Sequence, residues 1–427
     1  MAGASMPDRS IPFTRIAARL LTPLYLHVTF TILMIDEVLK SLSALPHRCS
    51  TTANERRAGE YLRQKMEDLG IDVQLSPFVA PTTFSWIYFI LYFGFILSAV
   101  VGAYLSILGF IIAVMFAVLF YGEQTTRFSP LSQWVPEGLS HNVIGRIPAP
   151  DRVKNTLVLV AHYDTSKASL LFHPRLTPRL RRSYLVSLVM IGLIIVGSAG
   201  RIIAPAGVDR VINWALVVPG LYLAVLCLGM IERELRRAFV NGAADNASGV
   251  AVALELAKRI QGQGGLPGWE VVVLLTGSEE TGLGGMKSFL AEAEKRLSRE
   301  TTVFMNFDNL GGGRLHYLQG EGMLFGLPSD PELLKIADGL VKSDPRFGGV
   351  GSRPFNALTL DTLVPRTQGY RVFSLMGLTE AGVPYPWHWY NDTLENLDRA
   401  LTQLAAEFGW EVVSRLASPA LHENHGA

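Results

Sequence analysis

The sequence predicts an α/β protein, a three-layer sandwich with a mixed, largely parallel core sheet flanked by helices, joined to four transmembrane helices that form two hairpins. Two observations predict this fold class. Strand-like and helix-like segments alternate through the polar parts of the chain, as they do where helices cover a parallel sheet. Long stretches without charged residues interrupt that alternation in two places, and each place has room for two membrane-spanning helices.

The strands of the predicted sheet are short apolar runs of the length that buried strands have. We expect them at residues 142–147, 157–161 and 270–275, and one more strand at 71–75, where apolar and polar residues alternate. Apolar residues at helical spacing predict helices within residues 36–70 and at 250–260, 286–293, 331–341 and 398–416. Without the apolar hairpins, roughly 280 residues remain, which suits a single domain.

The membrane spans are predicted from the absence of charge. Residues 73–122 contain no charged side chain, which leaves room for two spans of roughly 20 residues with a turn near 102–106. A second uncharged pair covers residues 183–200 and 211–231. Buried helices of a soluble core are the alternative, but helices this long and uncharged are rare there. A charged fraction of only 18% also favours a membrane protein.

The two hairpins divide the chain into six parts. These are an N-terminal interfacial or anchoring helix (1–35), a first part of the folded domain (36–81), transmembrane hairpin 1 (82–122), a second part of the domain (123–182), transmembrane hairpin 2 (183–231) and the remainder of the domain (232–427). Whether the N-terminal helix spans the membrane stays open.

The arginines beside the spans predict the orientation of the chain. Each hairpin returns the chain to the side that it left, so all parts of the folded domain share one side. That side carries Arg127, Arg175, Arg179, Arg181, Arg182, Arg233, Arg236 and Arg237, whereas the other carries Arg201 and Arg210. The positive-inside rule therefore predicts a multi-pass integral membrane protein with its folded domain in the cytoplasm.

Overall charge and cysteine content exclude several classes of function. The formal net charge is +1, and no Lys/Arg-rich run has the character of a nucleic-acid groove, so we expect no nucleic-acid partner. The two cysteines, Cys49 and Cys227, lie far apart and imply neither a disulfide framework nor a thiolate metal site.

Polar residues follow the predicted strands, at the edge where open α/β sheets bind ligands. His162 and Asp164 follow the strand at 157–161, and Glu279 and Glu280 follow the last of the four strands. A lone histidine at a strand end is more often structural, and adjacent glutamates usually lie in a solvated turn. The Asp164 carboxylate, however, can accept the imidazole N–H of His162 and leave the other ring nitrogen free for a metal.

Three further residues complete a candidate ligand set, although none of them is specific alone. Asp245 precedes the helix at 250–260, where a simple helix cap is the plainer interpretation. Asp308 follows an apolar segment, and His388 lies among aromatic residues. Together, two histidines and several carboxylates form the nitrogen and oxygen set that zinc accepts, with enough carboxylates for two ions. Manganese and cobalt remain open.

In their order along the chain, these motifs resemble the di-zinc aminopeptidases typified by bacterial leucyl aminopeptidase and aminopeptidase Y, a family whose relatives include glutamate carboxypeptidase and glutaminyl cyclases. The resemblance covers about 280 residues and leaves out the four spans. The matching elements are His162-x-Asp164, Asp245-Asn246-x-Ser248-Gly249, Glu279-Glu280, Asp308 and His388-x-x-x-Asp392-Thr393.

The resemblance implies that two Zn²⁺ ions share Asp245 and that Glu279 is the general base. The ligands that it implies besides Asp245 are His162 with Asp308 for one ion and Glu280 with His388 for the other. It further implies that Asp164 orients His162, that Asp392 supports the His388 loop, and that the Asp245–Asn246 bond is a candidate cis peptide.

The function implied is that of a zinc metallopeptidase, most simply an aminopeptidase that acts on a peptide substrate. An endopeptidase or carboxypeptidase on the same site, a glutaminyl cyclase and a non-catalytic scaffold are the alternatives. Because hairpin 2 falls between Asp164 and Asp245, we expect the catalytic mouth to face the lipid bilayer, and the substrates to be hydrophobic or membrane-associated. The oligomeric state and the residue preference stay open.

Overall fold

The computed structural model describes residues 33–203, 208–236 and 238–418. Within them the strands form one mixed sheet in the order β1-β2-β4-β3-β5-β9-β6-β7, and β8 pairs with β6. The strands are β1 (Asp72–Pro81), β2 (Glu137–Ile147), β3 (Asn155–His162), β4 (Trp269–Thr276), β5 (Thr302–Asp308), β6 (Arg314–Glu321), β7 (Leu327–Pro328), β8 (Gly351–Phe355) and β9 (Arg371–Leu378). The central strands β4, β3, β5 and β9 are parallel to one another, as expected.

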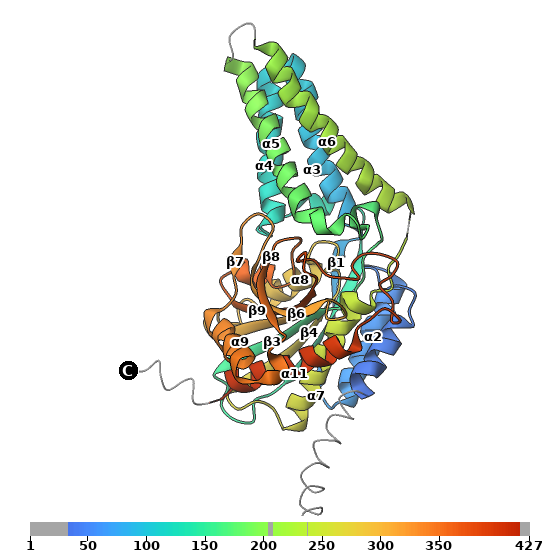
Figure 1. The fold of residues 1–427 in the computed structure, drawn as a ribbon, viewed down its shortest axis with the longest axis vertical. Helices are drawn as coiled ribbons and strands as arrows, with labels where there is room; N and C mark the ends of the chain where they lie inside the picture. Colours follow the sequence, from blue (N-terminus) through green and yellow to red (C-terminus); the bar gives the residue numbers. More distant parts are fainter. Residues whose placement is uncertain (1–32, 204–207, 237, 419–427) are drawn as a thin grey trace, which may run out of the picture.

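Helices cover both faces of the sheet and complete the predicted three-layer sandwich (Figure 1). They are α2 (Ala53–Asp68), α7 (Ser248–Gly262), α8 (Gly284–Ala293), α9 (Pro331–Ser343), α10 (Leu363–Thr367) and α11 (Arg399–Leu416). Alternate residues of β3 show the two faces. Leu157 and Leu159 belong to the core with α2, α7, α9 and α11, whereas Val158 and Val160 belong to the core with α8 and α10. Both faces of the central strands are thus buried, which is typical of parallel sheets.

Four apolar helices form a bundle at one end of the molecule (Figure 1). They are α3 (Ser85–Tyr104), α4 (Ser106–Gln124), α5 (Leu180–Ile203) and α6 (Asp209–Arg236). The first hairpin turns at Leu105, inside the predicted range. The last helix extends past the predicted end at 231, where an ion pair between Arg236 and Glu232 stabilises one further charged turn.

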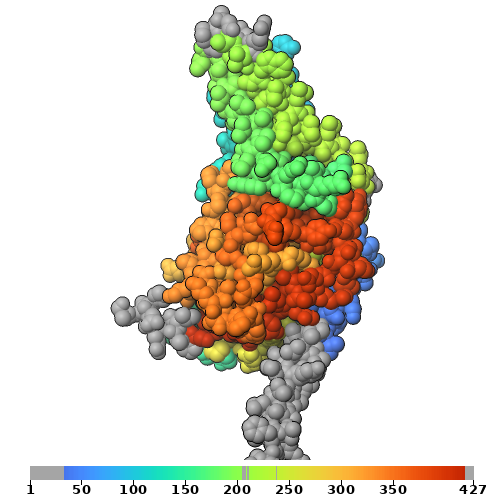
Figure 2. All heavy atoms as spheres, in the orientation of Figure 1, coloured from blue at the N-terminus to red at the C-terminus, as the bar shows by residue number. Residues whose placement is uncertain are grey.

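Each helix of this bundle is long and apolar enough to cross a membrane. The outward surfaces are apolar: Val196 is 69% exposed, Val225 65% and Leu221 64%. Figure 2 shows the bundle as a narrow column that rises from the wider sandwich domain. Most of the predicted N-terminal helix at 1–35 lies outside the described residues.

Both hairpins leave the sheet at the same edge. The first is inserted between the end of β1 and the start of β2, and the second follows β3. Because β1 and β4 are both antiparallel to β2, the end of β1 lies at the edge where β3 and β4 also end. The carboxyl ends of the central strands therefore lie on the side from which the bundle rises.

Candidate metal centre

The predicted ligands come together at this edge of the sheet. All five side chains are buried, and they meet because parallel strands end together. His162 ends β3, Asp308 ends β5, Glu280 follows β4, His388 lies in the loop after β9, and Asp245 lies just before α7.

The segment around Asp245 is held by the residues that follow it. The Asn246 side chain donates to the Phe307 carbonyl at 2.9 Å. Its Oδ1 accepts from the backbone N–H groups of Gly249 and Asn309. A Cβ on Gly249 would lie 2.1 Å from the Phe307 oxygen, so glycine allows α7 to approach β5 this closely. The Asp245–Asn246 peptide bond is cis, as expected.

The side chains form two clusters that share Asp245. One contains His162, Asp245 and Asp308, and the other contains Asp245, Glu280 and His388. In the first, His162 Nε2 lies 3.1 Å from Asp245 Oδ1 and 3.5 Å from Asp308 Oδ1. In the second, His388 Nε2 lies 3.0 Å from Asp245 Oδ2 and 2.9 Å from Glu280 Oε1.

Two observations test whether these residues fit metal ions. Neighbouring ligands of a tetrahedral zinc ion lie about 3.4 Å apart, which is close to the separations in both clusters. Among the described residues, Asp245 Oδ2 and Glu280 Oε1 are also buried without a well-aligned hydrogen bond, although His388 Nε2 lies 3.0 and 2.9 Å from them. Such oxygens are costly to bury, and a cation between them would satisfy both. The donor set fits two ions that share one carboxylate.

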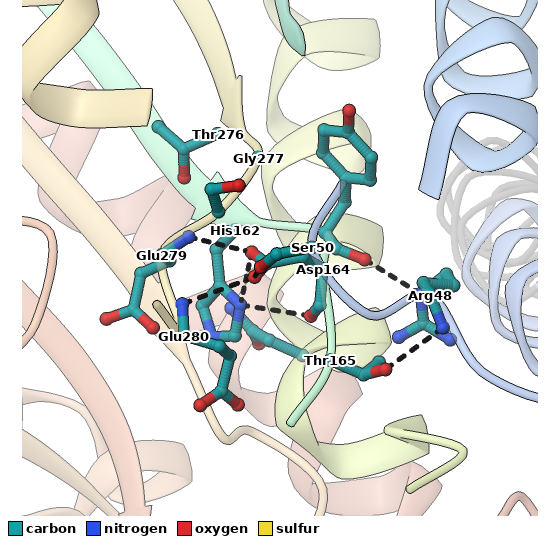
Figure 3. A network of polar contacts seen from close by, with 12 residues as sticks. Arg48, Ser50, His162, Asp164, Thr165, Thr276, Gly277, Glu279 and Glu280 are labelled. Carbon is teal, nitrogen blue, oxygen red and sulfur yellow. Dashed lines mark hydrogen bonds and ion pairs between the residues drawn. The ribbon is translucent and has the colours of Figure 1, made fainter. Parts of the chain in front are cut away.

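Asp164 lies beside His162, as expected, and it also holds a second group. Its carboxylate lies 3.6 Å from His162 Nδ1, and its backbone carbonyl is nearer to that nitrogen, at 3.2 Å. The carboxylate also accepts from Ser50 Oγ at 2.6 Å and from the backbone N–H groups of Glu279 and Glu280 at 3.0 and 3.2 Å (Figure 3). The Asp164 side chain therefore fixes the turn that carries the two glutamates.

Asp392 connects its own loop to the segment before α7. It accepts from the backbone N–H groups of Ala244 and Asp245, at 2.6 and 3.1 Å. His388, in the same loop, has a left-handed backbone with φ 46°, and its ring packs edge-on against Phe172, with 4.5 Å between the ring centroids. Asp392 thus joins the loop that carries His388 to the segment that carries Asp245.

Glu279 has an environment suited to holding a proton. Burial raises the pKa of its carboxyl above the ordinary value, and His162 opposes this. The nearby carboxylates of Asp361, Glu280 and Asp308 raise the pKa further. A carboxyl whose pKa is raised is a better proton acceptor near neutral pH.

Asp245 has the opposite environment. Burial opposes its ionisation, but the close imidazoles of His162 and His388 outweigh burial and hold the pKa of Asp245 below its ordinary value. Burial lowers the pKa of His388, and Glu280 and Asp245 outweigh that effect and raise it to about 9. The shared position of the two clusters is therefore occupied by an anion.

Arg48 supports the site, although nothing in the sequence marked it. It is fully buried, and its guanidinium donates to the carbonyls of Tyr163 at 2.8 Å and Gly242 at 2.7 Å. Burial lowers its pKa to about 10, so Arg48 is still a cation at neutral pH. It ties the end of β3 to the segment before Asp245. No motif reveals such a residue, because its partners are backbone carbonyls distant in the sequence.

Two buried carboxyls near Glu279 were also missed. Glu55, on α2, accepts from the Ser278 backbone N–H at 3.1 Å and thereby holds the turn after β4. Asp361 accepts a hydrogen bond from Thr276 Oγ1 and faces the same turn. Both lie in segments whose sequence gives no sign of contact with this edge of the sheet.

Comparisons with known proteins concern the family and the fold. Residues 228–413 match the model of peptidase family M28. A search of curated proteins found no match. A zinc aminopeptidase from Bacillus subtilis superposes with a TM-score of 0.52 at 14% identity, covering 90% of this chain and 95% of that one. A Zn-dependent exopeptidase from Parabacteroides distasonis superposes with a TM-score of 0.51 at 15% identity, covering 90% and 97%.

A glutaminyl cyclase from an Acidobacteriales bacterium also has this fold, with a TM-score of 0.52 at 14% identity over 97% of this chain and 99% of that one. At such identities, the likeness to solved structures concerns the fold. The family match rests on the sequence, and it includes Asp245, Glu280, Asp308 and His388. Residues 228–413 thus carry the sequence features of peptidase family M28, and together with the fold this match supports a hydrolase of the zinc metallopeptidase class.

Proposed function

We propose that the protein is a membrane-embedded aminopeptidase that hydrolyses peptide bonds with two zinc ions. The observation that carries this proposal is the pair of buried ligand clusters that share Asp245, in a chain that matches a peptidase family. The residues that would hold the ions are His162 and Asp308 for one, Glu280 and His388 for the other, and Asp245 for both.

The roles of the protein groups follow from their positions. Two bound zinc ions would polarise the substrate carbonyl and lower the pKa of a water molecule. Glu279 takes the proton from the attacking water at its carboxylate and then delivers it to the amine that leaves. Asp164 and Glu55 keep Glu279 in place through the backbone of residues 278–280. These contacts support Glu279 as the general base.

Cyclisation of an amino-terminal glutamine is the second candidate, because a glutaminyl cyclase shares the fold. Two complete clusters with a shared carboxylate favour the two-ion chemistry of hydrolysis. Activity on free amino termini would separate an aminopeptidase from an endopeptidase or carboxypeptidase on the same site.

Elemental analysis of the detergent-purified protein, paired with a peptide panel, tests the proposal. We expect about two zinc ions per chain and release of free amino acids only from peptides with an unblocked amino terminus. Cleavage of blocked peptides would indicate an endopeptidase or carboxypeptidase instead, and ammonia release from glutaminyl peptides without chain cleavage would indicate a cyclase. A protein that binds no metal would contradict the proposal.

We also propose that α3, α4, α5 and α6 cross the membrane and that the peptidase domain lies in the cytoplasm. The length and composition of the four helices support the crossing. Arg181 and Arg182 lie at the domain end of α5, and Arg201 is at its far end. A cysteine in place of the exposed domain residue Ser298 should react with a membrane-impermeant reagent only after cell lysis. Reaction in intact cells would reverse the orientation.

A further inference from the structure

A cavity of about 200 Å³ lies between the metal centre and the bundle. All four bundle helices line it with residues from their domain-side ends, among them Tyr88 and Tyr92 of α3, Gln124 of α4, Tyr184 and Ser187 of α5 and Met230 of α6. A water molecule needs roughly 10–15 Å³ of such space, so the cavity has room for a large side chain and part of its backbone.

The cavity adjoins the small pocket that contains the ligand clusters. Glu279, Glu280 and His388 line both of them, together with Leu358 and Thr359. A peptide bond at the metal centre would therefore have this cavity directly beside it. The bundle supplies one wall of the space next to the reacting groups, and the peptidase domain supplies the other.

The cavity extends along the axes of the bundle helices. Tyr92 lies seven residues after the start of α3, and Ser187 lies seven residues after the start of α5. At 1.5 Å per residue, each is about 10 Å from the domain end of its helix. The hydrocarbon core of a bilayer is about 30 Å thick. If the bundle spans a membrane, the cavity extends from the metal centre to the depth of the lipid tails.

The lining favours an apolar occupant. Three polar groups of its bundle wall already satisfy one another, because Gln124 donates to the Tyr88 hydroxyl at 3.0 Å and accepts from the Tyr184 hydroxyl at 3.1 Å. Apart from the site glutamates, the charged lining residues are Glu123 and Lys287, which carry opposite charges. Aromatic faces and aliphatic side chains therefore remain for contact with a ligand.

We propose that this cavity is a subsite, partly within the membrane, that receives a large apolar side chain next to the scissile bond of a membrane-associated peptide. The bundle helices α3 and α5 then set the residue preference of the enzyme. This inference rests on the proposed function, because it requires that the metal centre cleaves peptides. It assigns to the hairpins a direct part in substrate recognition.

Filling the cavity tests the inference. Ser187 is 2% exposed and lines the cavity, so S187F would occupy space that the substrate needs. We would compare kcat/KM for two dipeptide series, X-Ala and Ala-X, with X as Phe, Leu or Ala, using zinc-loaded protein in lipid nanodiscs. For the series whose X residue enters the cavity, the preference for Phe over Ala should fall at least tenfold, a typical range for a filled apolar pocket.

A matched control uses the same helix. Leu185 is 45% exposed on α5 and is absent from the cavity lining, so L185F adds the same side chain on the outer face. The Phe-to-Ala preference should stay within about twofold of wild type, well below the range for a filled pocket. Equal shifts in both variants, or no shift in S187F, would overturn the inference. If the wild type cleaves no peptide in a zinc-dependent manner, the proposed function itself fails.

A second measurement does not depend on the folding of S187F. The dipeptides (4-benzoylphenylalanyl)-alanine and alanyl-(4-benzoylphenylalanine) have a free amino terminus. Each carries a photoreactive benzophenone side chain, on one or the other side of the scissile bond. After irradiation with the wild-type protein, mass spectrometry should locate adducts on α3 near Tyr88 and Tyr92 or on α5 near Ser187. Adducts confined to the peptidase domain would contradict the inference, even in an enzyme that cleaves the same peptides.

Discussion

The peptidase domain and the bundle are stabilised in different ways. In the domain, both faces of the sheet are buried, and the ligand residues have specific partners on several strands and loops. In the bundle, large apolar side chains such as Val196 and Leu221 face outward. The metal centre of the domain thus requires particular residues at particular positions. The outer face of the bundle requires mainly that its residues are apolar, as expected for helices in lipid.

The two regions are joined by a polar cluster at the domain end of the bundle. Arg233, near the end of α6, donates to the side chains of Thr83, Ser85 and Ser166. Its guanidinium also lies 4.1 Å from the centre of the Phe84 ring. This arginine therefore links both hairpins to the segment that follows β3. Several position-specific contacts of the bundle lie at this end. The following predictions compare the effects of substitutions in the two regions.

The largest effect is expected at Glu279. Replacing it with alanine removes the proton acceptor but none of the ligands, so E279A should keep its zinc while turnover falls by about 10²–10⁴-fold. Steady-state kinetics with elemental analysis of the same preparation would measure both. E300A, a change at an exposed glutamate, is the control. An E279A enzyme with full activity would remove the general base from this position, and loss of zinc would make Glu279 a ligand.

Arg48 should have the next largest effect. A lysine has fewer donors and a different shape, so R48K should lose some of the bonds to the Tyr163 and Gly242 carbonyls. Each hydrogen bond of a charged group contributes about 1.5–3 kcal/mol, and we expect a loss of at least about 2 kcal/mol in stability and weaker zinc binding. Thermal unfolding and zinc titration would measure these changes.

The control for R48K is R346K, because the Arg346 side chain is 55% exposed and pairs with Asp344 and Glu411 at the surface. This change should cost less than about 0.5 kcal/mol. If the two variants were equally stable, Arg48 would not be the support that its contacts indicate, and the position-specific character of the domain would be weaker than we infer.

The ligand set could be predicted from the sequence because each ligand has a local signal. His162 and Asp308 end apolar runs, and Asp245 stands in a motif whose Asn246 and Gly249 hold the segment against β5. The strands of the second half of the sheet, from β5 onward, were not predicted, because short apolar runs there have no clear periodicity. The partners of the Asp164 carboxylate were also missed, since backbone N–H groups leave no trace in a sequence.

The inner surface of the bundle could not be predicted at all. Tyr88 and Tyr184 line the cavity, and Tyr184 is only 7% exposed. A uniformly apolar helix has no polar face to indicate which side points inward. Which side of such a helix points inward depends on how it packs against the neighbouring helices, and the sequence alone does not reveal that packing.

A smaller effect is expected at the domain end of the bundle. Gln124 connects the hydroxyls of Tyr88 and Tyr184, so Q124L should leave both without this partner and cost about 1–3 kcal/mol. Thermal unfolding in detergent would show a lower Tm with unchanged zinc content. Q133L, at an exposed glutamine, should leave the Tm near that of the wild type. Equal Tm values for the two variants would mean that composition alone stabilises this end of the bundle as well.

The last comparison concerns a pH dependence that belongs to the domain. Burial raises the pKa of Glu321 from an ordinary value of 4.5 to about 8. Below pH 4.5 the carboxyl is protonated in both states. As the pH rises from 4.5 to 8, the unfolded chain releases the proton and the folded chain keeps it, so stability falls by about 1.4 kcal/mol per unit at most. The wild type should therefore lose Tm between pH 5.5 and pH 9.

E321Q removes this titration and keeps the size of the side chain, so its Tm should fall less over the same range. The Glu321 carboxylate accepts from the Leu360 backbone N–H at 3.1 Å, and the amide oxygen of glutamine can accept the same bond. Comparing each variant with itself at two pH values cancels other effects of the substitution. An identical loss of Tm in both proteins would place the alkaline sensitivity elsewhere, in the carboxylates of the metal centre or at the polar end of the bundle.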